Sequence, residues 1–152
     1  MKLKWGIIAA GGIADRRMIP AMMASPVAEV VAVMDADMQT SCRVAEKYGI
    51  KHYYDNESDL LAHDEIDAVY IASPVYCHKK QAFMAADAKK HILLEKPIAL
   101  NAAEAREIVD YCGQKGVRAA AGYIMRFGTM NREIKRLLSE NKRKQYQART
   151  AE

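Results

Sequence analysis

Residues 4–14 read Lys4-Trp5-Gly6-Ile7-Ile8-Ala9-Ala10-Gly11-Gly12-Ile13-Ala14, and they are the most informative part of the sequence about its fold. An apolar run typical of a β-strand enters a turn with two adjacent glycines. Helix-period residues then continue to Ala24, where Ser25-Pro26 predicts the end of the helix. The turn fits the pattern G-x-G-x-x-G/A, with Ala9 in the first place, Gly11 in the middle and Ala14 in the last.

Outward from this stretch, apolar runs continue to alternate with helix-period segments. After a first strand at about 4–9, we expect strands at about 29–34, 51–53, 67–72, 91–94 and 118–122. Helices are expected at about 13–24, 39–48, 58–62 and 79–88, and another runs from the Asn101–Glu104 capping box to Gly116. Near-continuous apolar strands separated by helices predict an α/β fold with a doubly wound parallel sheet.

The glycine turn has a chemical interpretation. A glycine in the middle place lets the backbone approach a pyrophosphate, and a helix N-terminus offers free N–H groups. We therefore expect Ala9, Gly11, Gly12 and Ile13 at the phosphates of a dinucleotide. Asp35 follows the second strand about twenty residues further on, where a carboxylate accepts hydrogen bonds from the adenosine ribose. A turn without a ligand, and an Asp35 that only caps a helix or turn, remain open alternatives.

Asp35 also bears on the choice of cofactor. A carboxylate repels the 2′-phosphate of NADP, and Ala36 supplies no guanidinium to compensate. Asp37 adds further negative charge. The sequence therefore favours NAD over NADP.

Three polar segments follow later strands: Ser73-Pro74 with His78, Glu95-Lys96-Pro97, and Tyr123 with Arg126. Ligands of such sheets bind at the carboxyl ends of the strands, so these segments are candidates for the site. Taken alone, Glu95 and Lys96 also fit a surface ion pair at a strand end. A histidine near a helix start is, by itself, usually structural.

Together these motifs identify a resemblance. Glu95-Lys96-Pro97 after an apolar strand, the Ala9–Ala14 turn and the segment Gly122–Phe127 resemble the glucose–fructose oxidoreductase, inositol dehydrogenase and rhizopine-catabolism family (Gfo/Idh/MocA) over nearly the whole chain. The resemblance implies an NAD(P)-binding Rossmann fold. It also implies that Lys96 is catalytic and lies beside the nicotinamide and the reacting carbinol. Glu95 would orient or offset this lysine, and Pro97 would fix the turn through a cis bond.

Further site residues follow from the same resemblance. Pro74 and His78 match a Pro-x-x-x-His segment, with Val75 where the family often carries Asn. Ser73, Pro74, His78 and Glu95 are then expected on the cofactor side. Tyr123 and Arg126 match the segment that lines the substrate side.

The domain organisation is expected to be incomplete. Residues 1–127 would form the dinucleotide-binding domain, and 128–152 a closing helix with the start of a C-terminal α/β domain, whose first strand would begin at Gln145–Thr150. The family's second domain carries an Asp-x-x-x-His motif that this chain lacks. We therefore expect a truncated chain that binds NAD without turnover by itself. The parent protein would be a dehydrogenase of a sugar, inositol or related polyol.

Composition excludes several other classes. The net charge of +4 comes from residues 131–152, where seven Lys and Arg face three Glu; a solvated basic run is favoured there over a nucleic-acid site. No apolar run is long enough to span a membrane. Cys42, Cys77 and Cys112 suggest neither disulfides nor a metal site, which favours the cytoplasm. An exposed apolar face around Tyr123–Phe127 and the last helix predicts a homo-oligomer.

Overall fold

The computed structural model describes the backbone of residues 1–149 and the side chains of residues 1–140. The chain divides into two compact units, Met1–Gly122 and Tyr123–Glu152. The sequence analysis places its domain boundary a few residues later, after residue 127. Residues 150–152, which include the end of the expected final strand, lie outside the described part.

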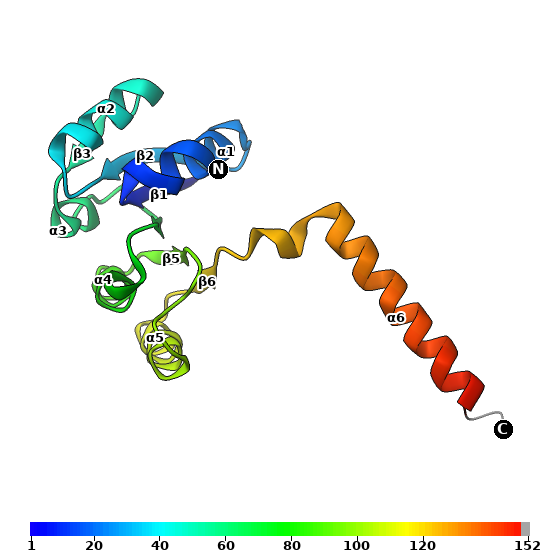
Figure 1. Cartoon of the computed structure of the whole chain (residues 1–152). Helices are drawn as coiled ribbons and strands as arrows, with labels where there is room; N and C mark the ends of the chain where they lie inside the picture. The colour runs from blue at the N-terminus through cyan, green and yellow to red at the C-terminus, as the bar shows by residue number, and fades with distance from the viewer. Residues whose placement is uncertain (150–152) are drawn as a thin grey trace. The chain divides into compact units, whose positions relative to one another are not determined.

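The first unit is built on a six-stranded sheet in which all neighbouring strands are parallel, in the order β3-β2-β1-β4-β5-β6 (Figure 1). The order reverses between β1 and β4, and ligands of such sheets bind at this switch point. The predicted doubly wound Rossmann fold is confirmed. The strands are β1 (Leu3–Ile8), β2 (Ala28–Met34), β3 (His52–Tyr54), β4 (Ala68–Ile71), β5 (His91–Leu94) and β6 (Ala119–Ala121).

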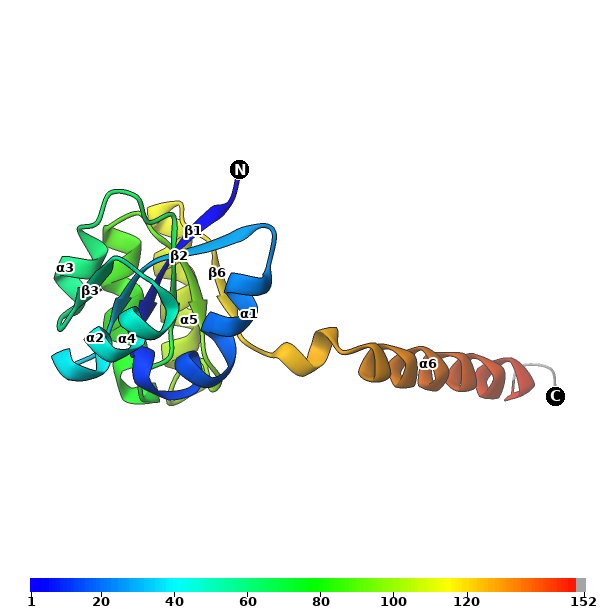
Figure 2. The same ribbon diagram turned by 90° about the horizontal axis from the view of Figure 1, so that it is seen from above.

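Helices cover the two faces of this sheet. One face carries η1 (Ala10–Met18), α1 (Ile19–Ala24) and α2 (Met38–Tyr48), and the other carries α3 (Glu57–Leu61), α4 (Val75–Asp87) and α5 (Ala102–Lys115). In Figures 1 and 2, α4 and α5 lie side by side.

A separate apolar core fills each side of the sheet. Ile7 and Ile8 are neighbours on β1, and both are fully buried. Because side chains alternate across a strand, Ile7 packs under η1, α1 and α2, whereas Ile8 packs under α3, α4 and α5. The central strand is therefore apolar on both faces, as its sequence indicated, and this double burial holds the carboxyl end of β1 in place.

Most expected elements are present, with two differences at helix starts. The helix expected at 13–24 is divided into η1, which is π-helical, and α1, where Pro20 has no N–H to donate. The helix expected from residue 79 starts four residues earlier, because Pro74 is accommodated at its N-cap. Gly49 and Gly116 end α2 and α5 in the left-handed conformation, with φ of 67° and 72°, as predicted.

The second unit consists of a short 3-10 helix, η2 (Ile124–Phe127), and the long helix α6 (Thr129–Arg149). The strand expected from Gln145 is wrong as far as Arg149, because α6 includes these residues. Lys, Arg, Gln and Ala favour helix, and no Gly or Pro follows Gly128 to end it. Among the described residues, no helix is long and apolar enough to cross a membrane.

Candidate functional site

The carboxyl ends of β1, β2, β4 and β5 lie along one edge of the sheet. Because these strands are parallel neighbours, the fold brings to this edge the segments that begin at Ala9, Asp35, Ser73 and Glu95. Tyr123 and Arg126 belong to the second unit, where the Arg126 N–H donates to the Tyr123 carbonyl oxygen over 3.0 Å. Their place on the substrate side stays a prediction.

The turn after β1 has an unusual backbone. Ala9 lies in the left-handed region, with φ of 64° and ψ of 68°. This conformation costs an L-residue about 1–2 kcal/mol, which explains why the sequence pattern has glycine in this place. The chain turns here directly into η1, whose first turn carries no acidic side chain. No acidic residue of η1 itself therefore opposes an anion at its start, and the carboxylate that approaches this start is that of Asp35.

Gly11 and Gly12 shape this turn in different ways. The Gly11 N–H donates to Oδ2 of Asp35 over 2.9 Å. A Cβ on Gly11 would lie only 2.5 Å from Cγ2 of Thr40 and 3.1 Å from Oδ2 of Asp35. A Cβ on Gly12 would meet nothing within 4 Å, and the neighbouring Ile13 is partly exposed. The turn is thus closed towards β2 and α2 and open at Gly12, which fits a group that needs close approach to backbone.

Two aspartates after β2 have different tasks. Asp37 is the N-cap of α2, where its carboxylate accepts hydrogen bonds from the Gln39 and Thr40 N–H groups. The hydrogen bond from the Thr40 hydroxyl, followed by these backbone bonds, lowers the pKa of Asp37. Asp35 caps no helix: its Oδ2 accepts the Gly11 N–H over 2.9 Å and joins the end of β2 to the glycine turn, and its Oδ1 accepts the Asp37 N–H over 3.3 Å. The helix-capping alternative therefore applies to Asp37, whereas Asp35 does have the turn contact that the sequence left open.

A buried carboxylate that the sequence analysis missed fixes η1 against α2. Asp15 is 7% exposed, and its carboxylate accepts hydrogen bonds from Lys47 at 2.7 Å, Tyr48 at 3.0 Å and Arg43 at 3.2 Å. Burial alone would raise the pKa of Asp15, but the hydrogen bonds from Lys47, Tyr48 and Arg43 outweigh burial and lower it. The aspartate is therefore held ionised, and η1 keeps its direction behind the glycine turn.

At the end of β4, His78 joins two segments of backbone. Its ring is 1% exposed, with Nε2 2.9 Å from the Ser73 carbonyl oxygen and Nδ1 3.1 Å from that of Ile98. A neutral imidazole has one N–H, so one of these contacts is a hydrogen bond in either tautomer. The ring thus holds the segments after β4 and β5 together, which supports a structural role for His78.

Ser73 is oriented from the same helix. Its hydroxyl donates to Gln81, whose amide donates to Glu57 over 2.7 Å. The hydrogen bond from Gln81 lowers the pKa of Glu57 against the opposing effect of burial. Pro74, between Ser73 and α4, is the N-cap residue of that helix.

The turn after β5 contains Glu95, Lys96 and a cis bond before Pro97. Oε1 of Glu95 accepts a hydrogen bond from the Tyr70 hydroxyl over 2.7 Å, and Oε2 accepts one from the Lys96 backbone N–H over 2.9 Å. Burial, and then the contact with Glu95, raises the pKa of Tyr70. Both carboxylate oxygens are thus engaged, and among the described side chains the Lys96 ammonium forms no ion pair.

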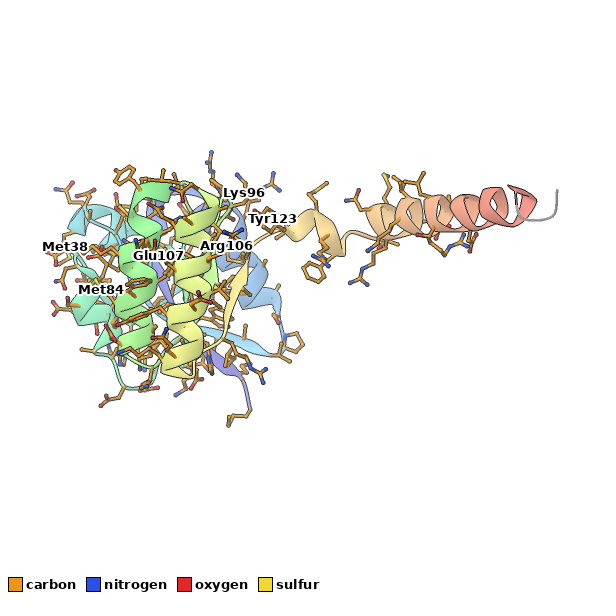
Figure 3. All side chains as sticks on the ribbon, turned by 90° about the horizontal axis from the view of Figure 1, so that it is seen from below. Met38, Met84, Lys96, Arg106, Glu107 and Tyr123 are labelled. Atoms are coloured by element: carbon orange, nitrogen blue, oxygen red, sulfur yellow. The ribbon has the colours of Figure 1, made fainter. Side chains whose placement is uncertain are left out.

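Lys96 is exposed at the edge of the first unit. Figure 3 shows it beyond the end of α5, the helix that carries Arg106 and Glu107. The surface ion pair with Glu95, which the sequence left open, is not formed. A free ammonium at the carboxyl edge of the sheet can donate hydrogen bonds to a ligand oxygen. In the described part of the chain, no three His, Cys, Asp or Glu side chains are arranged to hold a metal ion.

The residues that sequence reasoning missed, Asp15, Tyr70 and Gln81, share one property. Each is buried and bonds to a partner 8 to 33 positions away in the sequence. No local pattern marks such a pair. Buried polar groups in helical or strand patterns are the only signal that would have drawn attention to them.

Comparison with known proteins agrees with this geometry. Residues 3–123 match the family model described as an oxidoreductase family with an NAD-binding Rossmann fold (GFO_IDH_MocA). Glucose-6-phosphate 3-dehydrogenase of Bacillus subtilis is 35% identical over 138 residues, which cover 91% of this chain and 38% of that protein. D-xylose 1-dehydrogenase (NADP(+)) 2 of Haloferax volcanii is 34% identical over 137 residues, which cover 90% of this chain and 42% of that protein.

A solved structure extends the likeness to three dimensions. KijD10, a 3-ketoreductase from Actinomadura kijaniata in complex with NADP, superposes with a TM-score of 0.87 at 27% identity; the match covers 92% of this chain and 44% of that chain. The chain thus spans less than half the length of these relatives. By the match over residues 3–123, it belongs to the Gfo/Idh/MocA family of oxidoreductases and contains their NAD-binding Rossmann domain.

Proposed function

We propose that the chain binds NAD along the carboxyl edge of its sheet, and that the whole protein transfers hydride between NAD and a CH–OH group. The observation that carries this proposal is the contact of 2.9 Å between the Gly11 N–H and Asp35. It joins a glycine turn at a helix start to a carboxylate after β2, and these are the two groups that a dinucleotide half-site needs.

Each residue has a separate task in this proposal. The backbone of Gly11, Gly12 and Ile13, approached across the open side of Gly12, binds the pyrophosphate at the start of η1. Asp35 accepts hydrogen bonds from the adenosine ribose, next to the Gly11 and Asp37 N–H groups that it already binds. The Ser73-Pro74 segment borders the cofactor from β4.

Lys96 is the catalytic residue of the proposal. Its exposed ammonium donates a hydrogen bond to the substrate hydroxyl oxygen and stabilises negative charge there, while the hydroxyl proton passes to the histidine that the family resemblance assigns to the second domain. When bound, NAD supplies the acceptor for the hydride from the carbon that carries this hydroxyl. Among the side chains of residues 1–140, no carboxylate pairs with the Lys96 ammonium, which supports this role, since an ion pair would occupy its donors.

The substrate class is a sugar, inositol or related polyol. The names of the relatives support it, since they include dehydrogenases of glucose 6-phosphate and D-xylose. We infer that the 152-residue chain by itself binds NAD without turning over substrate, because it matches less than half of these relatives. The second candidate is an isolated NAD-binding or regulatory module that takes no part in catalysis, and turnover of a polyol by the whole protein would contradict it.

Binding of NAD rather than NADP is part of the proposal, although relatives with either cofactor are known. The 2′-phosphate of NADP would lie beside Asp35 and near Asp37, and Ala36 offers no positive charge. The carboxylate of Asp35 then accepts hydrogen bonds from the ribose of NAD and repels the 2′-phosphate of NADP.

Calorimetric titration of the chain with NAD and NADP tests the proposal. We expect tighter binding of NAD, and an Asp35→Asn variant that loses roughly tenfold in NAD affinity while its NADP affinity rises. Asp64→Asn is the matched control, since Asp64 is exposed in the loop before β4 at the opposite edge of the sheet. If neither dinucleotide binds the unmodified chain, the proposal fails.

The oligomeric state and the cellular location of the whole protein are also part of the proposal. We propose a homo-oligomer, because Met130, Ile134, Leu137 and Leu138 of α6 are each at least 46% exposed. Light scattering that finds only monomer at high concentration would contradict it. The three free cysteines agree with a cytoplasmic location.

A further inference from the structure

Glu95 and Lys96 are adjacent residues of opposite charge, yet they form no ion pair. Glu95 is half-buried, and its carboxylate turns away to the hydroxyl of Tyr70 and the Lys96 backbone N–H. Without the hydroxyl, Oε1 would lack this partner, and the nearest cation in the sequence is Lys96. The hydrogen bonds that hold the Glu95 carboxylate in place therefore determine whether the Lys96 ammonium is free.

Tyr70 is suited to hold it. It lies on β4 opposite Leu93 of β5, two residues before Glu95, and its side chain is fully buried. A buried phenol needs a hydrogen-bond acceptor, and Glu95 at 2.7 Å is the acceptor that the structure supplies. Burial, and then Glu95, raises the pKa of Tyr70, so its hydroxyl keeps its proton at neutral pH and can donate to the carboxylate.

Gly122 borders Glu95 from the other side. Its N–H donates to the Leu94 carbonyl oxygen over 2.7 Å, and a Cβ at this position would lie 3.2 Å from that oxygen and 3.6 Å from Oε1 of Glu95. The Glu95 carboxylate thus sits between the phenol of Tyr70 and the backbone at the end of β6. Its position is set by the domain interior and not by solvent.

We propose that Tyr70 is a positioning residue, which holds the Glu95 carboxylate inside the domain so that the Lys96 ammonium stays free for the nicotinamide side of the site. The assignment of the nicotinamide to Lys96 rests on the proposed function, but the state of the ammonium does not. Tyr70 acts through Glu95 and touches neither substrate nor cofactor.

The reactivity of Lys96 tests this without any ligand. Cyanate carbamylates neutral amines, and mass spectrometry of the full chain after digestion gives the rate at Lys96. In Tyr70→Phe, Glu95 should turn to the ammonium and slow carbamylation of Lys96 about two- to fivefold, as expected for an exposed ion pair. The double variant Tyr70→Phe/Glu95→Gln should recover the original rate, because an amide forms no ion pair.

Matched controls separate positioning from general stability. Tyr111→Phe also removes a hydroxyl that donates to a carboxylate, that of Asp87 at 2.9 Å, and should leave the Lys96 rate unchanged. Glu95→Gln alone should leave it unchanged too, which provides a test even if Tyr70→Phe does not fold. An unchanged rate in folded Tyr70→Phe, a slow double variant, or a faster Glu95→Gln would each overturn the proposal.

A second measurement connects this proposal to binding. Tyr70→Phe should leave the affinities for NAD and for ADP-ribose almost unchanged, because in the proposed function the Lys96 ammonium binds the substrate hydroxyl and not the cofactor. A merely destabilised domain would lose both ligands equally, and that outcome would overturn the positioning role. If the unmodified chain binds neither ligand, the proposed function fails, whereas the carbamylation result still decides the role of Tyr70.

Discussion

The two halves of the carboxyl edge hold their functional groups in different ways. In the half built on β1 and β2, the proposed ligand-binding surface is backbone, shaped by Gly11 and supported by the buried ionic cluster around Asp15. In the half built on β4 and β5, the proposed surface is a side chain, Lys96, supported by the hydroxyl of Tyr70 and the ring of His78. The first half thus depends on the missing side chain of Gly11 and on charged hydrogen-bond partners of Asp15. The second half depends on a phenol hydroxyl and an imidazole ring.

The largest effect is expected at Gly11. Gly11→Ala places a methyl group 2.5 Å from Cγ2 of Thr40 and 3.1 Å from Oδ2 of Asp35, so these side chains, α2 or the turn must move. We expect a loss of about 1–3 kcal/mol in the free energy of unfolding and a fall of roughly 10- to 100-fold in NAD affinity. Chemical denaturation and calorimetry measure the two quantities.

Gly113→Ala is the control for this substitution. Gly113 lies inside α5, where a Cβ would meet nothing within 4 Å, so alanine should stabilise the helix by up to about 1 kcal/mol. If Gly11→Ala behaves like Gly113→Ala, close approach to the backbone at residue 11 is not what the half built on β1 and β2 depends on.

A smaller effect is expected at Asp15, and it depends on pH. Asp15→Asn should cost about 1–2 kcal/mol at neutral pH, since it weakens charged hydrogen bonds whose partners are half exposed. The pKa of Asp15 is lowered in the fold, so its contribution is complete above the ordinary pKa of aspartate and is lost as the pH falls through the lowered value. Denaturation of both proteins from pH 7 downwards should give converging stabilities.

Asp87→Asn is the matched control, because Asp87 also binds a lysine and a tyrosine, Lys115 and Tyr111, but at the surface. Its loss should be clearly smaller, since solvent screens the pair. Equal losses for the two variants would mean that burial adds nothing to the cluster at Asp15. The contrast between the supports of the two halves of the carboxyl edge would then lose its basis.

The smallest effect is expected at Ala9, and it has the opposite sign. Ala9→Gly relieves a left-handed alanine at φ of 64°, and the gain exceeds the added flexibility of the unfolded chain by about 0.5–1 kcal/mol. Thermal unfolding measures the change. Ala103→Gly in α5 should instead destabilise, because the helical backbone there favours alanine. If Ala9→Gly is instead destabilised, packing of the Ala9 side chain stabilises the turn by more than its left-handed backbone costs.

Much of the first unit was predictable because its signals are local. The apolar runs, the glycine turn, the Asn101 cap and the glycines at helix ends each lie within a few residues, and the structure has them in the expected order. The predictions failed where the local pattern was ambiguous. The helix α4 starts four residues earlier than predicted, because Pro74 is accommodated at its N-cap. The segment from Gln145 to Arg149 forms helix although a strand was expected.

Local patterns in the sequence specify which groups stand at the ends of the strands, since alternation and turn residues set where each strand stops. They were sufficient to predict the places of Asp35 and Lys96 along the chain, and the family. Which partner each charged group binds depends on the folded arrangement. Asp35 turns to Gly11, Glu95 to Tyr70 and Asp15 to Lys47, and each choice pairs residues from different elements. Such pairs form because buried polar groups must find partners, and folding alone decides which partners are near.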